Sequence, residues 1–350
     1  MKLKKWAKAT GQTALIGSAA FLVGAAFLSI AGVSPLVAFT YILKGALGSP
    51  AKISYVIQAW IPLAICACGL IYPFRTGLLN IGVEGQMMWG ALCCTAIMRQ
   101  GANIDMPIPV IILAFLAAAG GGTIWALLAG ILKTKGGVNE IFGGLGLNFV
   151  AQGTILWLIF GPWKRPGIAS MSGTELFSHD LWLPSVMSGR ISPVGFILAA
   201  IVFTSTAMLL AKTNLGLYLK TVSSNDRAAF LMGLKPDRHI LLAMAVSGGC
   251  AGLAGAVQVT GVYHCLIPSI SGNYGYLALL VVMLANNRIG AAMLIAFFFA
   301  GLNVGSIQLP LMMHLDSSLS GVLQGALVLA ALAVYSRGKK KSDGSSAWTD

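Results

Sequence analysis

Two carboxylates lie within long apolar runs of this chain, where an ionisable group is costly and by default suggests a function. Glu84 lies in "RTGLLNIGVEGQMMWG", residues 75–90, and Glu140 lies in "GGVNEIFGGLGLNF", residues 136–149. Each follows basic residues, which predicts a position near the cytoplasmic end of a span. Such a carboxylate can tie helix ends through Arg75 or backbone amides, titrate during gating or coupling, or contact the substrate. The tie is favoured.

Amide side chains accompany both carboxylates. Asn80 and Glu84 are four residues apart, which predicts that they share a helix face and bond to each other or to a neighbour. The candidate gating or helix-tie residues are Asn80, Glu84, Gln86, Asn139 and Glu140.

A polar and small stripe continues from the second carboxylate. Glu140, Gly144, Asn148 and Gln152 recur every four residues, so they follow one slowly turning helix face. Asn303 provides a similar polar position further along. Uncharged amides suit a path for a neutral, hydroxyl-rich or heterocyclic solute, and they equally suit hydrogen bonds between helices. The candidate path residues are Asn148, Gln152 and Asn303.

The loop "LKTVSSNDRAAFLMGLKPDRHI", residues 219–240, predicts a short capped helix. Asn225 or Ser224 can cap its first turn, and Gly233 suits the left-handed position after its end. A freestanding helix of about two turns between two spans is suited to being gripped by another protein, although an ordinary capped linker has the same pattern. The candidate contact residues are Asn225, Asp226, Arg227, Ala228, Ala229, Phe230 and Gly233.

Composition indicates the elements that must position these residues. Of the 350 residues, 57% are hydrophobic and 9% are charged, whereas a soluble domain carries roughly 25% charged residues. Recurrent apolar runs predict an all-α polytopic membrane protein with one permease domain over 1–350 and about ten spans, within a range of eight to ten. The expected spans are 14–33, 54–73, 78–98, 108–132, 138–160, 191–211, 241–262, a short one at 275–285, 289–308 and 318–336.

The net charge of +13 is explained by topology. With the amino terminus in the cytoplasm, most of the 23 lysines and arginines fall on the cytoplasmic side, which agrees with the positive-inside rule. Both termini are then cytoplasmic, and the charge is no sign of nucleic-acid binding. Residues 212–240 form the main cytoplasmic loop and 161–190 an external one. The six cysteines have no metal-site spacing, so no metal is expected.

Two further features concern packing. Glycines gathered in "AAAGGG", "GGLGLN" and "SGGCAGLAGA" predict close helix contacts. The 275–285 span is short and "GLLNIGVEG" is interrupted by glycines, which suggests two related half-bundles around a central path.

Residues 34–53 are predicted to form a short helix near the outer interface.

Several stretches together carry a family resemblance. "RTGLLNIGVEGQMMWGA", "GGVNEIFGGLGLNFVAQG", "VSSNDRAAFLMGL" and "SGGCAGLAGAVQVTG" occur in order across residues 55–335. The chain resembles the permease subunit of a bacterial ATP-binding-cassette (ABC) importer of the ribose and branched-chain amino-acid permease family, in the nucleoside or simple-sugar branch that works with basic-membrane-protein lipoproteins. It departs from the usual loop motif at Ser223, Ser224, Asp226, Phe230 and Leu231.

The resemblance implies a multi-pass subunit of the bacterial cytoplasmic membrane that carries a nucleoside or simple sugar and is not itself an enzyme. Residues 225–233 would be the coupling helix that seats in a cytoplasmic ABC ATPase. A second permease, identical or homologous, and an extracytoplasmic solute-binding lipoprotein would complete the assembly.

The chain has no G-x-x-x-x-G-K-[ST] phosphate loop, so ATP and Mg would bind the partner ATPase and no cofactor would bind this chain. The rival interpretation is a proton- or sodium-coupled secondary transporter that uses Glu84 or Glu140. A membrane-embedded enzyme is a more distant one.

Overall fold

The computed structural model describes residues 34–101, 106–165, 173–186 and 191–307, with isolated positions outside these ranges (25, 26, 29, 104, 312 and 325). These residues are almost entirely helical, and their one β-type pairing is an isolated bridge between Val186 and Ile191. The predicted all-α class is confirmed. The helices are α2 (Pro35–Leu47), α3 (Pro50–Arg75), α4 (Val83–Gln100), α5 (Pro107–Thr134), α6 (Glu140–Phe160), η2 (His179–Leu181), α7 (Pro193–Lys212), α8 (Asn214–Ser224), α9 (Asp226–Leu231), α10 (Pro236–Gln258), η3 (Val259–Tyr263), α11 (Tyr274–Leu284) and α12 (Ile289–Ser306).

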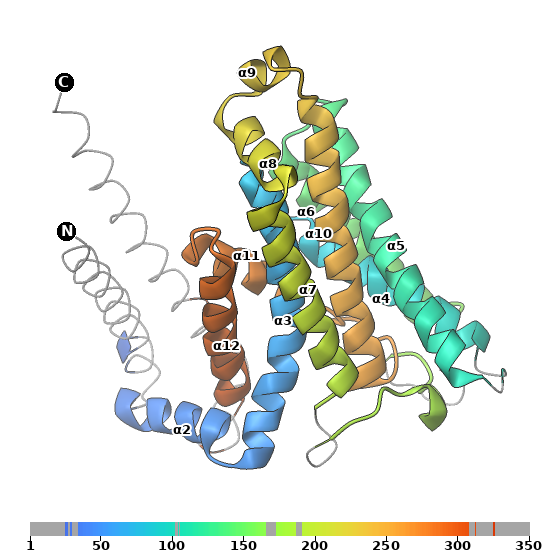
Figure 1. Cartoon of the computed structure of the whole chain (residues 1–350). Coiled ribbons are helices and arrows are strands. Elements are labelled where there is room, and N and C mark those ends of the chain that lie inside the picture. Colours follow the sequence, from blue (N-terminus) through green and yellow to red (C-terminus); the bar gives the residue numbers. More distant parts are fainter. Residues whose placement is uncertain are drawn as a thin grey trace. The chain divides into compact units, whose positions relative to one another are not determined.

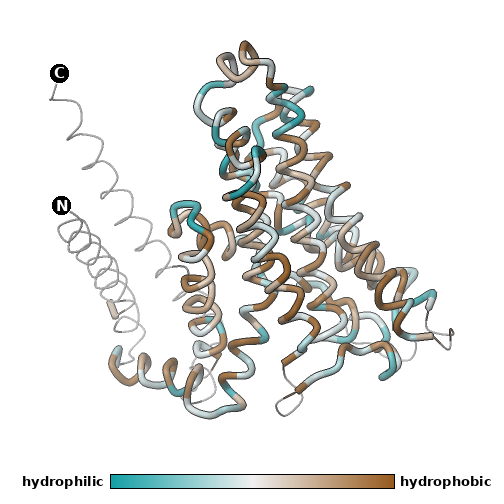
Figure 2. Tube along the Cα trace, in the orientation of Figure 1, coloured by the Kyte–Doolittle hydropathy of each residue, from teal (hydrophilic) through white to brown (hydrophobic). Residues whose placement is uncertain are grey.

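Six helices of the described part are long and apolar enough to cross a membrane: α3, α5, α6, α7, α10 with η3, and α12. The helices α2 and α11 are apolar but shorter. Figure 2 shows apolar residues along the long helices and hydrophilic ones around α8 and α9. The expected span 14–33 lies almost entirely outside the described residues, and 318–336 does so except for one position. The total of ten spans therefore stays a prediction.

Proline sets where many of these helices begin. The first residues of α2, α3, α5, α7 and α10 are Pro35, Pro50, Pro107, Pro193 and Pro236. Proline suits the first helical position, because its fixed φ is helical and its missing N–H would have no intrahelical partner there. The boundaries of these helices are therefore encoded locally.

The chain forms two compact units. The larger unit runs from Ile57 to Phe297, and the smaller one contains the described residues before and after it. Within the larger unit α10 packs against both α4 and α5, and α6 packs against α4 and α5. A Cβ at Gly252 would collide with the Ala118 carbonyl, and one at Gly122 would lie 2.9 Å from the Gly252 Cα. Small residues bring these backbones together, as the glycine-rich sequence predicts.

Two connections enter the interior of the larger unit from opposite ends. Residues 76–82 leave α3 at Arg75, at the end that carries α8 and α9, which we call the α9 end. Within them, Asn80 Nδ2 donates to Ser247 Oγ (3.0 Å), and Ser247 lies about 16 Å along α10 from Pro236 at about 1.5 Å per residue. Residues 264–273 leave η3 at the far end and reach Gln152. Helices α4 and α11 therefore begin inside the unit.

This arrangement corrects one expectation. The sequence placed Glu84 about six residues into a helix that starts near residue 78, but α4 begins at Val83 and residues 78–80 are not helical. Gly77 adopts φ +83° and Gly82 caps α4. The glycine-rich connection is thus a re-entrant turn, and Glu84 lies in the first turn of α4.

The loop 212–240 contains two helices where the sequence predicted one. The amphipathic α8 follows α7, and α9 lies beyond the ends of α8 and α10 (Figure 1). In the predicted external loop, residues 173–186 form a short extended segment with η2, and residues 166–172 and 187–190 fall outside the described part.

Candidate functional site

Glu84 joins the starts of two helices. Its side chain is 2% exposed, and its Oε2 accepts hydrogen bonds from the backbone N–H groups of Gly275 (2.8 Å) and Tyr276 (3.3 Å). These amides lie in the first turn of α11, where N–H groups have no intrahelical partner. Of the partners expected for Glu84, the structure shows backbone amides and not Arg75, whose Nη1 donates to the Leu210 carbonyl (3.3 Å).

Gly275 makes this approach possible. A Cβ at this position would lie 2.8 Å from the Glu84 Cα and 2.8 Å from its backbone N, closer than two packed atoms can come. The two helix starts therefore touch through backbone as well as through the carboxylate. Each N-terminus carries a partial positive charge, so a negative side chain between them is electrostatically favourable.

An amide network surrounds this junction. Asn80 and Gln86 exchange two hydrogen bonds, with Asn80 Nδ2 donating to Gln86 Oε1 (3.0 Å) and Gln86 Nε2 donating to Asn80 Oδ1 (2.9 Å). Asn80 also reaches Ser247 of α10. Asn80 does not share a helix face with Glu84, because the segment before Gly82 is not helical; that prediction was wrong. Asn80 instead fixes the re-entrant connection to α4 and α10.

Asn148 connects α6 to both helix starts. Its Oδ1 accepts from the Gly85 N–H (2.8 Å), and its Nδ2 donates to the Ile81 carbonyl and to the Tyr276 hydroxyl oxygen (both 3.0 Å). The side chain is buried. All of these partners are protein groups, so in this structure Asn148 makes interhelical hydrogen bonds.

The other two candidate path residues lie elsewhere. Gln152 Nε2 donates to the Pro268 carbonyl (2.9 Å), which ties α6 to the second re-entrant connection. Asn303 lies on α12 in the smaller unit and is partly exposed. The polar residues of the stripe all lie on α6, but they contact different parts of the protein: Glu140 pairs with Lys133, Asn148 bonds to both helix starts and Gln152 bonds to Pro268.

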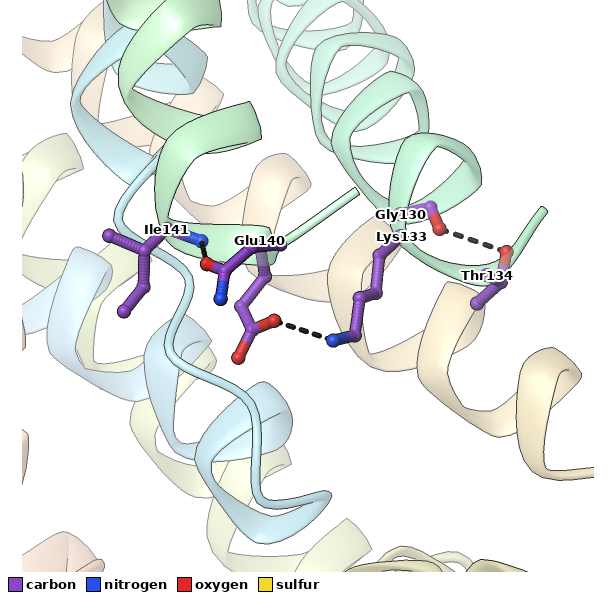
Figure 3. A network of polar contacts seen from close by, with 6 residues as sticks. Gly130, Lys133, Thr134, Glu140 and Ile141 are labelled. Carbon is purple, nitrogen blue, oxygen red and sulfur yellow. Dashed lines mark hydrogen bonds and ion pairs between the residues drawn. The ribbon is translucent and has the colours of Figure 1, made fainter. Parts of the chain in front are cut away.

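Glu140 and Lys133 lie on either side of the turn between α5 and α6 (Figure 3), and Asn139 precedes α6 there. Glu140 Oε2 lies 2.7 Å from Lys133 Nζ, and Asn139 Oδ1 caps α6 by accepting from the Ile141 N–H (2.9 Å). Both side chains of the ion pair are partly exposed. The residues grouped by the sequence as ties therefore divide into a buried junction around Glu84 and a surface pair at this turn.

The helix α9 has the capping that the sequence predicts. Of the two cap candidates, Asn225 takes the role, with Oδ1 accepting from the Ala228 N–H (3.0 Å). Gly233 ends the turn with φ +83°. Ala229 is buried and packs with Val222 of α8 and Ile240 of α10. Asp226 and Arg227 belong to α9 by their backbone.

The end of α9 presents apolar side chains to its surroundings. Phe230 is 67% exposed, Leu231 is 86% exposed and Met232 is 76% exposed. We call these three residues the α9 tip. The same loop also exposes the basic side chains Lys220, Lys235 and Arg238. The sequence indicated Phe230 only; nothing in the local pattern separates Leu231 and Met232 from residues that fold back onto the bundle.

At the far end, an aromatic stack joins the 173–186 segment to the residues after η3. The ring centroids of His179 and Trp182 are 4.0 Å apart, and those of Trp182 and His264 are 3.8 Å apart. Phe177 N–H donates to the His264 carbonyl (3.0 Å). Burial lowers the pKa of His264, and nearby His179 lowers it further, whereas a hydrogen bond to the Thr260 carbonyl acts in the opposite direction. No local pattern indicates this contact, because its partners are far apart in the chain.

Comparison with known proteins identifies the class of chain that carries these features. Residues 52–332 match the family model of the permease component of the branched-chain amino acid transport system. The chain belongs to this permease family. The predicted resemblance is confirmed, and the match covers both re-entrant connections and α9.

Curated relatives extend the comparison. The glucose ABC transporter permease protein TsgB13 of Haloferax volcanii is 29% identical over 92% of this chain and 86% of its own length. The guanosine ABC transporter permease protein NupP of Bacillus subtilis is 25% identical over 92% of this chain and 93% of its own. The nucleoside ABC transporter permease protein NupB of Lactococcus lactis is 26% identical over 82% and 80%. Among solved structures, PsaBC from Streptococcus pneumoniae in complex with Fab aligns with a TM-score of 0.46 at 12% identity, over 85% of this chain and 94% of that one.

Proposed function

We propose that this chain is the membrane-spanning subunit of an ABC importer that moves a nucleoside or a simple sugar across the bacterial cytoplasmic membrane. Family membership supports the transport role, and the relatives named for guanosine, nucleosides and glucose support the solute class. The apolar helices support a multi-pass chain in a lipid bilayer. The positive-inside bias supports an orientation with both termini in the cytoplasm.

The structural observation that carries the proposal is α9. A helix of six residues is too short to be stable alone, yet this one is capped by Asn225, anchored by Ala229 and tipped by three exposed apolar side chains. The α9 tip lies in the loop 212–240, which is predicted to be cytoplasmic. An ATPase subunit that receives α9 in a groove would bury the tip and couple ATP hydrolysis to movement of α8 and α10.

The remaining parts of the assembly follow from this role. ATP and Mg bind the partner ATPase, since this chain has no phosphate-loop motif. A second permease subunit, identical or homologous, completes the passage, and an extracytoplasmic solute-binding lipoprotein delivers the solute. Glu140, Lys133 and Asn139 hold the α5–α6 turn on the cytoplasmic side, and Asn148, Gln152 and Asn303 are the path candidates.

A proton- or sodium-coupled secondary transporter is the alternative. It would need a carboxylate that is free to titrate in a path, but Glu84 holds two backbone amides and Glu140 pairs with Lys133. These contacts, together with the permease family, favour the ABC assignment.

Uptake in proteoliposomes tests the proposal. The chain is reconstituted with candidate ATPase, second permease and lipoprotein subunits from the same organism, and uptake of radiolabelled guanosine and glucose is measured with and without internal ATP. We expect uptake of one solute that requires ATP and is unaffected by an uncoupler. Uptake that persists without ATP and collapses with the uncoupler would establish the secondary transporter instead.

A further inference from the structure

The short helix α11 is set apart from its neighbours by backbone conformation at both ends. Gly272 (φ +54°) and Asn273 (φ +61°) precede it, and Asn286 (φ +49°) and Asn287 (φ +58°) follow it. Left-handed backbone is uncommon outside glycine, and asparagine is among the residues that tolerate it best. Paired left-handed residues break a helix sharply, so α11 is a separate rod of 11 residues with a hinge-like turn at each end.

Polar contacts hold the start of this rod. Glu84 of α4 accepts from two of its amides, and Asn148 of α6 donates to its Tyr276 hydroxyl. The helix against which α11 chiefly packs is α4. Hydrogen bonds of this kind can be broken and remade in discrete steps, unlike the interlocked glycine contacts between α5 and α10.

The start of α11 lies where the two re-entrant connections of the larger unit come together. The connection from the α9 end and the connection from the far end meet where Glu84 contacts Gly275. Residues 76–82 lead from the α9 end directly into α4, and Leu78 of this connection packs with the cluster that contains Ala229 of α9. A shift of α9 therefore has a short covalent and packed route to the Glu84 carboxylate.

The carboxylate is not fully satisfied in this arrangement. Glu84 Oε1 is buried and has no hydrogen bond of standard length and angle with the described residues; the Ser271 side chain and the Asn273 backbone are the further groups that interact with this carboxylate. Buried acceptors without partners are rare and call for an explanation such as stored strain. A residue that served only to hold two helices would gain from satisfying both oxygens, whereas a residue that exchanges partners needs an oxygen free to receive the next donor.

We propose that Glu84 positions α11 during transport. In this state its carboxylate latches the N-terminus of α11 to the N-terminus of α4, and the latch opens and closes once per transport cycle as α11 turns about residues 272–273 and 286–287. The proposal rests on the proposed function. It assigns Glu84 no contact with the solute. Loss of its negative charge leaves two positive helix ends facing each other, so the latch weakens even if the helices remain folded.

Hydrogen exchange in the full transporter tests the latch. Amide exchange of peptides from 274–284 is followed by mass spectrometry in lipid nanodiscs for the wild type, Glu84→Gln and Glu84→Asp. Glu84→Gln keeps the size of the side chain but replaces a charge-assisted hydrogen bond by a neutral one, so exchange at Gly275 and Tyr276 is expected to rise about tenfold. Glu84→Asp, which keeps the charge, is expected to lie between. Glu140→Gln is the matched control and is expected to leave this exchange unchanged.

Two further readouts separate a latch from a purely structural tie. In the wild-type complex, exchange at Gly275 and Tyr276 is expected to differ between the nucleotide-free and the vanadate-trapped state. In Glu84→Gln, ATP hydrolysis is expected to continue while solute uptake falls at least tenfold. Equal exchange in both wild-type states, or a Glu84→Gln variant in which α10 exchanges faster along with α11, overturns the proposal, because the first shows no opening and the second shows general destabilisation. Wild-type protein that carries no solute would defeat the proposed function while leaving the exchange result standing.

Discussion

Shortening one exposed leucine tests whether the α9 tip binds a partner. Leu231 is 86% exposed in the chain alone, so nearly all of its side chain is available for burial in an ATPase groove. Leu231→Ala removes three carbons, which at about 0.8 kcal/mol each amounts to about 2.4 kcal/mol for complete burial. Scaled by the exposed fraction, the loss is about 2 kcal/mol, or about 30-fold in the dissociation constant. If the groove covers only half of the side chain, the loss is about 1 kcal/mol, or roughly fivefold.

The substitution leaves the fold of α9 intact, since alanine is at least as good a helix former as leucine. Leu217→Ala is the matched control: Leu217 is also exposed and lies on α8 of the same loop, outside the tip. Affinity for the purified ATPase is measured by biolayer interferometry with the permease in nanodiscs. The measurement is made at about 50 mM and about 500 mM salt, because high salt screens interactions between charges. An apolar contact predicts a loss that persists at high salt. A change below twofold for Leu231→Ala, or an equal loss for Leu217→Ala, would refute the reasoning.

Three further predictions concern capping, the aromatic stack and helix packing. Asn225→Ala removes the cap of α9 and is expected to destabilise that helix by about 1 kcal/mol, seen as faster amide exchange in α9 and weaker ATPase binding, whereas Asn225→Ser should retain most of both. Because burial depresses the pKa of His264, the stack contributes its full stability above the ordinary pKa of about 6.5 and loses it as pH falls through the lower folded value. Trp182 fluorescence should therefore change on acidification, and it should change less in His264→Phe. Gly252→Ala places a Cβ against the Ala118 carbonyl and is expected to cost about 1–3 kcal/mol, measured as a lower thermal midpoint, while Gly153→Ala, at a position with open space, should leave the midpoint nearly unchanged.

Local sequence signals are sufficient to predict many of the helices of this protein. Apolar runs longer than about 18 residues indicate membrane helices on composition alone, and α3, α5, α6, α7, α10 and α12 lie where such runs occur. The cap at Asn225 and the left-handed Gly233 are properties of a few consecutive residues, so they were predictable from the loop sequence. Glycine-rich runs similarly indicated close helix contacts.

The interrupted segment around Glu84 shows where local reasoning stops. The glycines indicated an interruption, but a helical pattern was extended back over Asn80, because apolar residues alone do not reveal a chain that turns back into the bundle. The partners of Glu84 are Gly275 and Tyr276, about 190 residues away. A buried amide or carboxylate is equally compatible with a substrate path and with a helix tie until its neighbours are known.

By itself, therefore, the sequence determined the elements of this protein: its apolar helices, their proline starts and the capped α9. Its charge bias predicts how these helices are oriented. These depend on interactions within a few residues or with the surrounding bilayer, which every chain of this composition meets. Tertiary structure alone decided that α4 and α11 begin inside the larger unit with Glu84 between them, and that Phe230, Leu231 and Met232 stay uncovered. The physical reason is that packing pairs residues distant in the chain, and which amide, hydroxyl or backbone N–H faces a side chain follows only from the complete arrangement of the helices.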